Sequence, residues 1–172
     1  MAKKNFKQLI KDVKSFVFDI DGVLTDGSIM VMENGQMVRT MNTRDGYALQ
    51  HAMKNGYKIG VISGGKSAPT KERLEKLGIH DVYLGITDKL DSLKEFMHTH
   101  NLKYENILYM GDDMPDYEVM RKCGIPCCPK DGAQEIKNLC VYISDKKGGD
   151  GCVRDVIEQV MKVQKKWLMD NV

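Results

Sequence analysis

The chain has 172 residues, of which 42% are hydrophobic, and its 26 lysines and arginines nearly balance its 24 aspartates and glutamates. This length suits a single domain, residues 1–172, that buries about two thirds of the surface its unfolded form would expose. The net charge of +2 argues against nucleic acid or a membrane surface as a partner, so specificity has to come from local sites.

The N-terminal sequence and the cysteines predict a cytoplasmic protein. The first ten residues, MAKKNFKQLI, are basic but lack the apolar core of a signal peptide, and no segment approaches the ~20 apolar residues of a membrane helix. The five cysteines are odd in number, include the adjacent Cys127 and Cys128, and never show the C-x-x-C spacing of a zinc or redox site. We therefore expect reduced thiols and no membrane partner.

The first strong pattern is SFVFDIDGVLTDG, residues 15–27. Its first residues predict a short strand buried on both faces, and Asp19 and Asp21 stand two apart on the same side where that strand ends. Two neighbouring carboxylates repel, so the pair indicates a cation or a shared proton. Gly22 permits a tight turn or a close approach of the backbone to a ligand. Taken alone, the motif is equally compatible with a solvated turn.

Residues 28–41 predict a β-hairpin, which we call the flap. Two alternating apolar segments surround Asn34-Gly35, a dipeptide typical of tight hairpin turns. The apolar residues of the flap are Ile29, Val31, Met37, Val38 and Met41. An isolated ribbon is marginally stable, so we expect the flap to pack against another subunit, with packing against its own domain as the alternative.

A second strand pattern ends in small residues that suit an anion. A helical stripe is expected in YALQHAMKNG, residues 47–56, closed by Asn55-Gly56, and YKIGVIS, residues 57–63, follows as a buried strand. After it, Ser63-Gly64-Gly65-Lys66 precedes a helix that begins near Pro69, and such a loop exposes backbone N–H groups. Loops of this kind are also rich in glycine for steric reasons, so this signal is weak by itself.

A second acidic cluster follows another predicted strand. Thr87-Asp88-Lys89 begins a helix that runs to His100, and NILYM, residues 106–110, is the next strand. It leads directly to Asp112, Asp113 and Asp116. Helix capping explains one of these aspartates well and all three poorly.

The last part of the chain continues the alternation of strands and helices. Strands are expected over residues 125–129 and 141–144, with a short helix over 132–139 between them. The loop GGDG, residues 148–151, leads to a terminal amphipathic helix whose apolar stripe we expect to extend to Trp167 and Leu168. The chain as a whole predicts an α/β fold: a Rossmann-like, doubly wound, largely parallel sheet with helices on both faces.

The joint order of four motifs is more specific than any one of them. DIDG, VISG, TDKL and GDDMPD resemble the four motifs of the haloacid dehalogenase superfamily, and the resemblance spans about residues 15 to 130. The short chain without room for a cap domain, FDIDGVLTDG, the Asn-Gly hairpin, NTRDGYAL and a late GGxGxxR are similar to one capless group within it, the tetrameric 2-keto-3-deoxy-octulosonate 8-phosphate phosphatases.

This resemblance implies a Mg²⁺-dependent phosphatase that acts on a small sugar acid phosphate. It implies that Asp19 attacks phosphorus and that Asp21 protonates the departing sugar oxygen and later activates water. Mg²⁺ would be held by the Asp19 carboxylate, the backbone carbonyl of Asp21 and Asp112. Asp113 and Asp116 would orient these ligands.

The resemblance also implies which groups bind the phosphate. Ser63 and the backbone of Gly64 and Gly65 would donate to phosphoryl oxygens, and Lys89 would offset the charge of nucleophile and phosphate. Many relatives have Gly-Arg where this chain has Gly65-Lys66, and a lysine does not reproduce the planar guanidinium of arginine. Lys66 is nevertheless a candidate substrate-binding residue.

Two arginines and the flap are the remaining candidates for substrate selection. Arg44 and Arg154 either bind the carboxylate of the sugar acid, within one subunit or across a subunit boundary, or form surface ion pairs. The resemblance implies a homotetramer in which the flaps of four subunits assemble and a neighbouring subunit helps to close each active site.

Several alternatives stay open at this point. The substrate is an eight-carbon keto-sugar acid phosphate, a nine-carbon one, or any small phosphate ester. A phospho-accepting signalling module is disfavoured because Ser63 stands where its aspartate belongs. A non-catalytic binding subunit has no physical reason to keep mutually repelling carboxylates.

Overall fold

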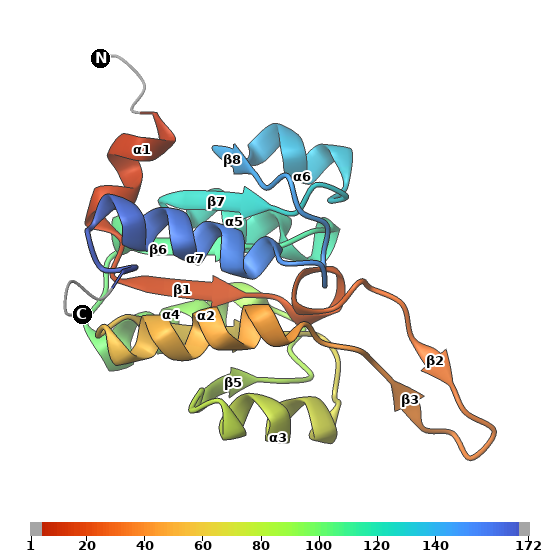
Figure 1. The fold of residues 1–172 in the computed structure, drawn as a ribbon. Helices are drawn as coiled ribbons and strands as arrows, with labels where there is room; N and C mark the ends of the chain where they lie inside the picture. The colour runs from red at the N-terminus through yellow and green to blue at the C-terminus, as the bar shows by residue number, and fades with distance from the viewer. Residues whose placement is uncertain (1–4, 169–172) are drawn as a thin grey trace.

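Six parallel strands form the central sheet in the computed structural model, which describes residues 5–168 (Figure 1). The strands are β1 (Ser15–Phe18), β4 (Lys58–Ile62), β5 (Asp81–Tyr83), β6 (Ile107–Met110), β7 (Ile125–Cys128) and β8 (Tyr142–Ile143). Their order, β5-β4-β1-β6-β7-β8, starts at the middle and winds outward in both directions. This confirms the predicted doubly wound sheet and places its switch point at β1.

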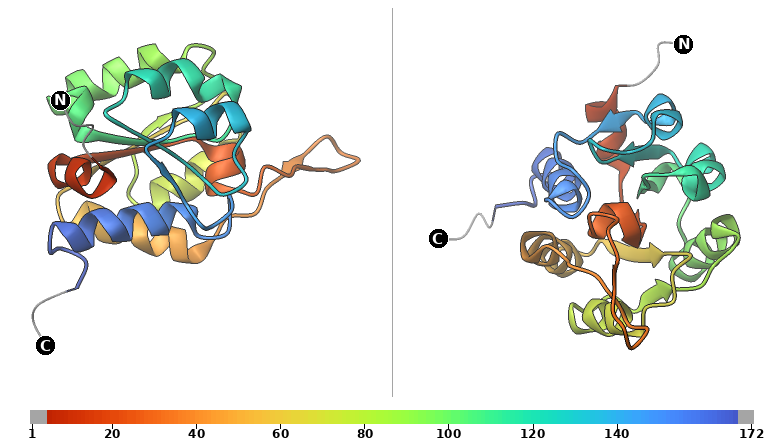
Figure 2. Two further views of the ribbon diagram at one scale, coloured as in Figure 1. Left: turned by 90° about the horizontal axis from the view of Figure 1, so that it is seen from above. Right: turned by 90° about the vertical axis from the view of Figure 1, so that its right-hand side faces the viewer.

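Helices cover both faces of this sheet (Figure 2). One face carries α2 (Thr43–Lys54), α3 (Ala68–Lys76) and α7 (Cys152–Val163), and the other carries α4 (Lys89–His100), α5 (Tyr117–Lys122) and α6 (Gln134–Leu139). The short α1 (Phe6–Leu9) and a 3-10 turn precede β1. The sheet therefore separates two apolar cores, one on each face.

Strand β1 shows why the apolar runs of the sequence form central strands. Phe16 and Phe18 point into the core beneath α2 and α7, whereas Val17 points into the core beneath α4 and α5. All three side chains are fully buried. A strand that is covered on both faces has to be apolar at every position, which explains the unbroken run before Asp19.

The flap projects from the carboxyl ends of the strands (Figure 1). It consists of β2 (Met30–Val31) paired antiparallel with β3 (Met37–Val38). The backbone N–H of Met32 donates to the carbonyl of Gln36 at 2.8 Å, and Gly35 adopts a φ of +82° that favours glycine. The predicted hairpin is therefore present, with its turn at Asn34-Gly35.

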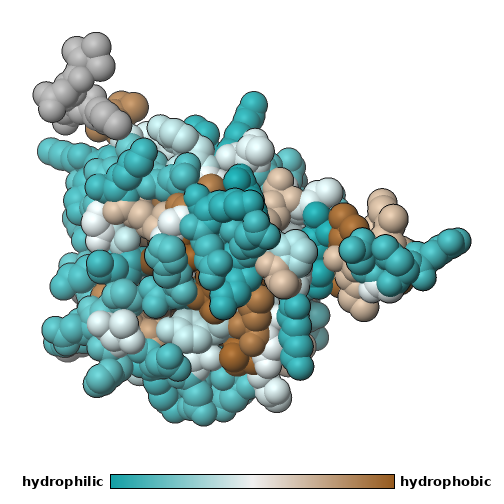
Figure 3. Space-filling model, turned by 90° about the horizontal axis from the view of Figure 1, so that it is seen from below, coloured by the Kyte–Doolittle hydropathy of each residue, from teal (hydrophilic) through white to brown (hydrophobic). Residues whose placement is uncertain are grey.

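The apolar side chains of the flap face outward. Met30, Val31 and Met37 are 64%, 70% and 59% exposed. Figure 3 shows apolar side chains on the projecting flap and in the region beside its base. Within the chain, the flap therefore does not bury these side chains against its own domain.

The last helix is shorter than its sequence pattern predicts. Helix α7 ends at Val163, and Lys165 takes a left-handed φ of +57° that the helix cannot continue through. The prediction that Trp167 and Leu168 extend the helical stripe is therefore wrong. Instead the Trp167 carbonyl lies 2.8 Å from Nε2 of His51, on α2.

None of the helices in residues 5–168 combines the length and the apolar character needed to cross a membrane. The five cysteines are unpaired, and four of them are buried.

Candidate active site

The predicted motif residues meet in one hollow of about 330 Å³ at the carboxyl ends of β1, β4 and β6. We call it the acidic hollow. Its predicted members are Asp19, Asp21, Ser63, Gly64, Gly65, Lys89, Asp112, Asp113 and Asp116. Because neighbouring parallel strands end at the same edge, residues that are far apart in sequence meet there.

A buried lysine holds two carboxylates of the hollow. Lys89 is only 5% exposed, and its Nζ lies 3.0 Å from Oδ1 of Asp19 and 2.8 Å from Oδ1 of Asp116. Asp116 also accepts hydrogen bonds from the Tyr109 hydroxyl and from the backbone N–H of Asp112. Asp116 is therefore fully engaged and fixes both Lys89 and the backbone at Asp112.

Asp19 is held rigidly through one of its two carboxylate oxygens. Its Oδ1 accepts a hydrogen bond of 2.7 Å from the backbone N–H of Ile20 as well as the contact with Lys89. Among residues 5–168, Oδ2 of Asp19 has no hydrogen-bond partner. The side chain thus presents one fixed and open oxygen to the hollow.

The hollow carries more negative charge than Lys89 balances. Burial, together with the charge of Asp116, raises the pKa of Asp19 to about 7. Burial and the charge of Asp19 raise the pKa of Asp112 to about 7 as well. Both shifts indicate that the ionised carboxylates need a further positive charge nearby.

The donor atoms suit a divalent cation with oxygen ligands. Carboxylate oxygens of Asp19, Asp112 and Asp116 all lie within 4.8 Å of one another. Since Asp116 already accepts from three groups, Asp19 and Asp112 are the two with oxygens left for a metal. Gly22 permits this arrangement, because a Cβ there would lie 1.9 Å from Oδ2 of Asp112.

The remaining acidic residue of this cluster lies at the rim. Asp113 is exposed, and its Oδ1 accepts from the backbone N–H of Met114 at the start of the next turn. It therefore shapes the turn that carries Asp116. Whether the backbone carbonyl of Asp21 binds a metal stays a prediction.

The loop after β4 brings Ser63, Gly64 and Gly65 to the acidic hollow. Ser63 is 2% exposed, and its Oγ accepts from the backbone N–H of Gly65 at 3.2 Å. The carbonyl oxygens of Ser63 and Gly65 accept from Ile86 and Gly85. The loop is thus tied to the segment before Lys89, which places hydroxyl and backbone groups at the edge of the hollow.

The structure adds one residue that the sequence analysis missed. Arg39, at the base of the flap, donates from Nε to Oδ1 of Asp21 at 2.7 Å and from Nη2 to Oδ2 at 3.2 Å. This hydrogen-bonded contact raises the pKa of the Arg39 guanidinium. The sequence did contain a signal for Arg39, because it is the one charged residue in the alternating series Met37, Arg39 and Met41, whose side chains lie on the same side of an extended chain.

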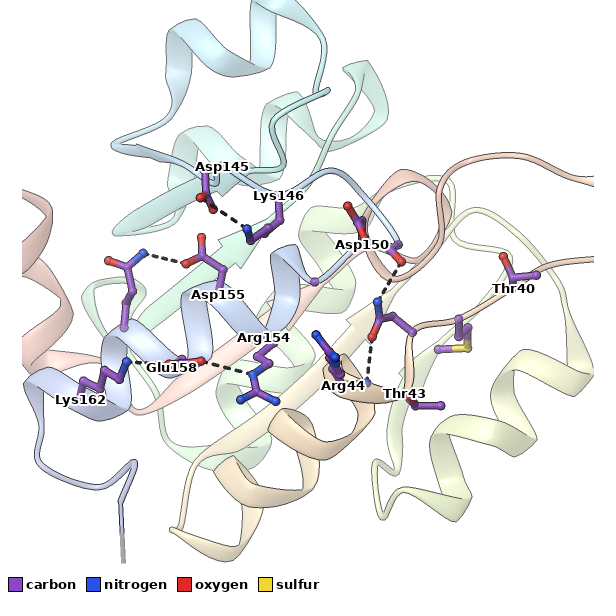
Figure 4. A pocket seen from close by; sticks show the side chains of 15 residues that line it. Thr40, Thr43, Arg44, Asp145, Lys146, Asp150, Arg154, Asp155, Glu158 and Lys162 are labelled. Carbon is purple, nitrogen blue, oxygen red and sulfur yellow. Dashed lines mark hydrogen bonds and ion pairs between the residues drawn. The ribbon is translucent and has the colours of Figure 1, made fainter.

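Arg44 and Arg154 lie outside the acidic hollow. They line a separate cavity of about 900 Å³ between the base of the flap, the start of α2 and α7 (Figure 4). Arg154 lies 3.3 Å from Glu158 and over the ring of Trp167 at 5.3 Å. Within one chain the two arginines are therefore not brought to the acidic hollow, and their role toward a substrate stays a prediction.

Sequence comparison relates the chain to phosphatases. Residues 76–156 match the haloacid dehalogenase-like hydrolase family. The chain is 31% identical to the 3-deoxy-D-manno-octulosonate 8-phosphate phosphatase KdsC of Escherichia coli K12 over 156 residues, which cover 91% of this chain and 83% of that protein. It is 30% identical to KdsC of Yersinia pestis, over 92% of this chain and 85% of that protein.

Structural comparison agrees with the sequence. A 3-deoxy-D-manno-octulosonate 8-phosphate phosphatase from Moraxella catarrhalis, in complex with a magnesium ion, a phosphate ion and a KDO molecule, superposes with a TM-score of 0.90 at 32% identity. The match covers 94% of this chain and 92% of that one. The cobalt-bound phosphatase YrbI from Haemophilus influenzae gives a TM-score of 0.91 at 27% identity, over 96% of each chain.

The raised pKa values predict that protons compete with Mg²⁺ at this site. Below pH 7 Asp19 and Asp112 hold protons that a cation has to displace, so we expect the affinity for Mg²⁺ to fall by about 10-fold or more between pH 8 and pH 6. Calorimetry in two buffers of different ionisation enthalpy measures both the affinity and the protons released. Asp91→Asn, at an exposed residue of α4, is the control and should behave like wild type. An affinity that is equal at both pH values would contradict this electrostatic description.

Proposed function

The chain belongs to the haloacid dehalogenase-like hydrolases, and from this premise we propose that it hydrolyses 3-deoxy-D-manno-octulosonate 8-phosphate with the help of Mg²⁺. The observation that carries the proposal is the Asp19 carboxylate, which Lys89 and the Ile20 N–H hold with one oxygen open to the acidic hollow. The relatives named above are phosphatases of this sugar acid phosphate, and one of them contains magnesium, phosphate and the sugar acid.

In the first step Oδ2 of Asp19 attacks the phosphorus atom, and the bond to the sugar oxygen breaks. The product is a phosphoryl group bound to Asp19. Lys89, at 3.0 Å from the Asp19 carboxylate, offsets the negative charge that gathers there. Ser63 and the N–H group of Gly64 donate to the phosphoryl oxygens, and the N–H group of Gly65, which donates to Oγ of Ser63 at 3.2 Å, orients that hydroxyl.

Asp21 moves the proton in both steps. It first protonates the departing sugar oxygen, so that this oxygen leaves as a hydroxyl group and not as an alkoxide. It then takes a proton from the water that attacks the phosphoryl group on Asp19, which releases phosphate and restores the free carboxylate. Asp19 and Asp112 would hold Mg²⁺, which would supply positive charge to the phosphoryl oxygens.

Assembly through the flaps is part of the proposal. The exposed apolar residues of the flap, Met30, Val31, Met37 and Val38, would lose their contact with water if flaps of several subunits packed together. A two-stranded ribbon also needs such a partner for stability. We infer a homotetramer in which the flaps form the contact between subunits.

We also propose that the protein is located in the reducing cytoplasm, which agrees with its five free cysteines.

Replacing the nucleophile tests the reaction. Asp19→Asn should reduce Mg²⁺-dependent phosphate release from 3-deoxy-D-manno-octulosonate 8-phosphate by about 10⁴-fold or more, because the amide does not attack phosphorus. The variant should remain folded, since it removes one of several repelling carboxylates. Colorimetric phosphate release and thermal unfolding measure the two effects, with Asp91→Asn as the control. Turnover near the wild-type level in Asp19→Asn would contradict the role of Asp19.

A substitution on the flap tests the assembly. We expect wild type to sediment as a tetramer at micromolar concentration and Met37→Asp to sediment as a smaller species, because the new charge would be buried in the contact. Gln36→Asp adds the same charge at the neighbouring polar position and should preserve the tetramer better. A wild-type monomer at micromolar concentration would contradict assembly through the flaps.

A further inference from the structure

Two segments outside the acidic hollow meet at the turn that carries Asp21. The first is NTRDG, residues 42–46, which contains the start of α2, and the second is GGDGCVR, residues 148–154, which contains the start of α7. Members of both segments line the cavity in Figure 4. None of these residues, all of which the structure describes, lines the acidic hollow. An effect of these segments on the proposed reaction therefore has to act through neighbouring residues.

The loop before α7 packs directly on the turn of Asp21, which spans Ile20–Leu24. The backbone N–H of Gly149 donates to the carbonyl of Val23 at 3.0 Å. A Cβ added to Gly148 would collide with the carbonyl oxygen of Gly22. A larger residue at this position would push one of the two backbones away, so the close approach requires glycine.

Gly149 also contacts both ends of the segment that forms the flap. A Cβ added to Gly149 would lie 2.6 Å from the backbone nitrogen of Asp26, where the chain leaves the turn. The carbonyl of Gly149 accepts a hydrogen bond of 3.3 Å from Nδ2 of Asn42, where the chain returns from the flap. One residue of the loop therefore holds together the two chain ends between which the flap and Arg39 project.

Asn42 joins this loop to α2. Its Oδ1 accepts from the backbone N–H groups of Arg44 at 2.8 Å and of Asp45 at 3.4 Å, which caps the helix. Its Nδ2 is the group that donates to Gly149. An aspartate would cap the helix as well as an asparagine but has no N–H to donate. The two functions of Asn42 are therefore separable by substitution.

Asp45, on α2, caps the neighbouring helix α7. The N-cap residue of α7 is Gly151, which has no side chain that could accept from the first turn. Oδ1 of Asp45 takes this place, because it accepts a hydrogen bond of 2.8 Å from the backbone N–H of Arg154, the third residue of α7. Asp45 is 1% exposed, and its Oδ2 has no partner among residues 5–168. Since an unpaired buried oxygen lowers stability, a contribution to stability alone does not explain Asp45.

The turn lies between this loop and the predicted metal ligand Asp112. The carbonyl of Gly22 faces Gly148, and a Cβ on Gly22 would point at Oδ2 of Asp112. If the loop moved, the turn would lose its support on the side opposite Asp112. The positions of Asp21 and of the carboxylate of Asp112 would then no longer be fixed relative to each other.

Asn42, Asp45 and the Gly148–Gly149 loop form one connected unit, which we call the brace. We propose that the brace positions Asp21 against Asp112, with Asn42 and Asp45 as positioning residues. This inference rests on the proposed function, because that function gives Asp21 and Asp112 their roles in proton transfer and metal binding. The brace touches no substrate in this description, so its loss should lower kcat and the affinity for Mg²⁺ more than it raises KM.

The first test separates the two functions of Asn42. Asn42→Asp keeps the cap of α2 but loses the bond to Gly149, so the affinity for Mg²⁺ and kcat should each fall by about 10-fold, the effect of one hydrogen bond. KM for 3-deoxy-D-manno-octulosonate 8-phosphate should stay within about twofold. Calorimetry with MgCl₂ alone at pH 8 and phosphate release measure these quantities.

Asn5→Asp is the matched control. Asn5 is the N-cap of α1 and accepts from the backbone N–H of Gln8, and its side-chain N–H groups donate to none of the described residues. The substitution thus makes the same chemical change at another helix start without removing a donor that is used. Its Mg²⁺ affinity and kcat should equal those of wild type.

Substitutions of Asp45 test the other half of the brace. Asp45→Ala removes the acceptor for Arg154 and should lower the affinity for Mg²⁺ by about 10-fold. Asp45→Asn keeps an oxygen at the same place and should stay within about threefold of wild type, because the hydrogen bond and not the charge holds α7. Circular dichroism and thermal unfolding verify that folded protein is compared.

Wild-type Mg²⁺ affinity and kcat in Asn42→Asp, with a shift in the unfolding temperature alone, would overturn the proposal, because the contact would then serve stability only. A loss of affinity in Asp45→Asn as large as in Asp45→Ala would overturn the role of Asp45. The proposed function is judged separately: a wild type that binds Mg²⁺ but releases no phosphate from the sugar acid phosphate would refute that function, and the Mg²⁺ affinities would still decide on the brace. A wild type that binds no Mg²⁺ would overturn both.

Discussion

The buried ammonium group of Lys89 is the interaction on which the candidate site depends. It contacts Asp19 and Asp116 at once, and Asp116 also binds the Tyr109 hydroxyl and the backbone of Asp112. Residues that follow three different strands are thereby joined in one network. Without this cation the carboxylates would repel one another in a buried position, and their geometry would be lost. Burying these charged groups lowers the stability of the folded chain, and the two apolar cores compensate for this loss.

The charges around this network are mostly negative, because five aspartates and one lysine line the acidic hollow. The acidic hollow lies at the switch point of the sheet, where a metal ion and a phosphate ester would meet. The base of the flap lies next to it, where Arg39 pairs with Asp21. The flap thus combines two features: its outer apolar side chains are exposed, and its base carries the arginine that binds Asp21.

The sequence was sufficient for the fold and for the grouping of the motif residues, because both depend on local patterns. A strand buried on both faces is apolar at every position, as in β1, and the residues that follow parallel strands meet at one edge. The Arg39–Asp21 pair was not predictable in this way, because it depends on how the flap folds back over the strand end. The end of α7 was missed for a related reason: Lys165 adopts a left-handed conformation that its residue type does not indicate. The positions of Arg44 and Arg154 depend on the packing of α2 against α7, which local patterns do not reveal.

We propose above that the acidic hollow is a metal-dependent phosphatase site that acts on a keto-sugar acid phosphate. The most direct test of this proposal is phosphate release with Mg²⁺ from a panel that contains the eight-carbon and nine-carbon keto-sugar acid phosphates and neutral sugar phosphates. We expect the eight-carbon ester to have the highest kcat/KM and to exceed the neutral esters by about 100-fold, the effect expected from paired hydrogen bonds to its carboxylate. A flat profile across acidic and neutral esters would contradict it.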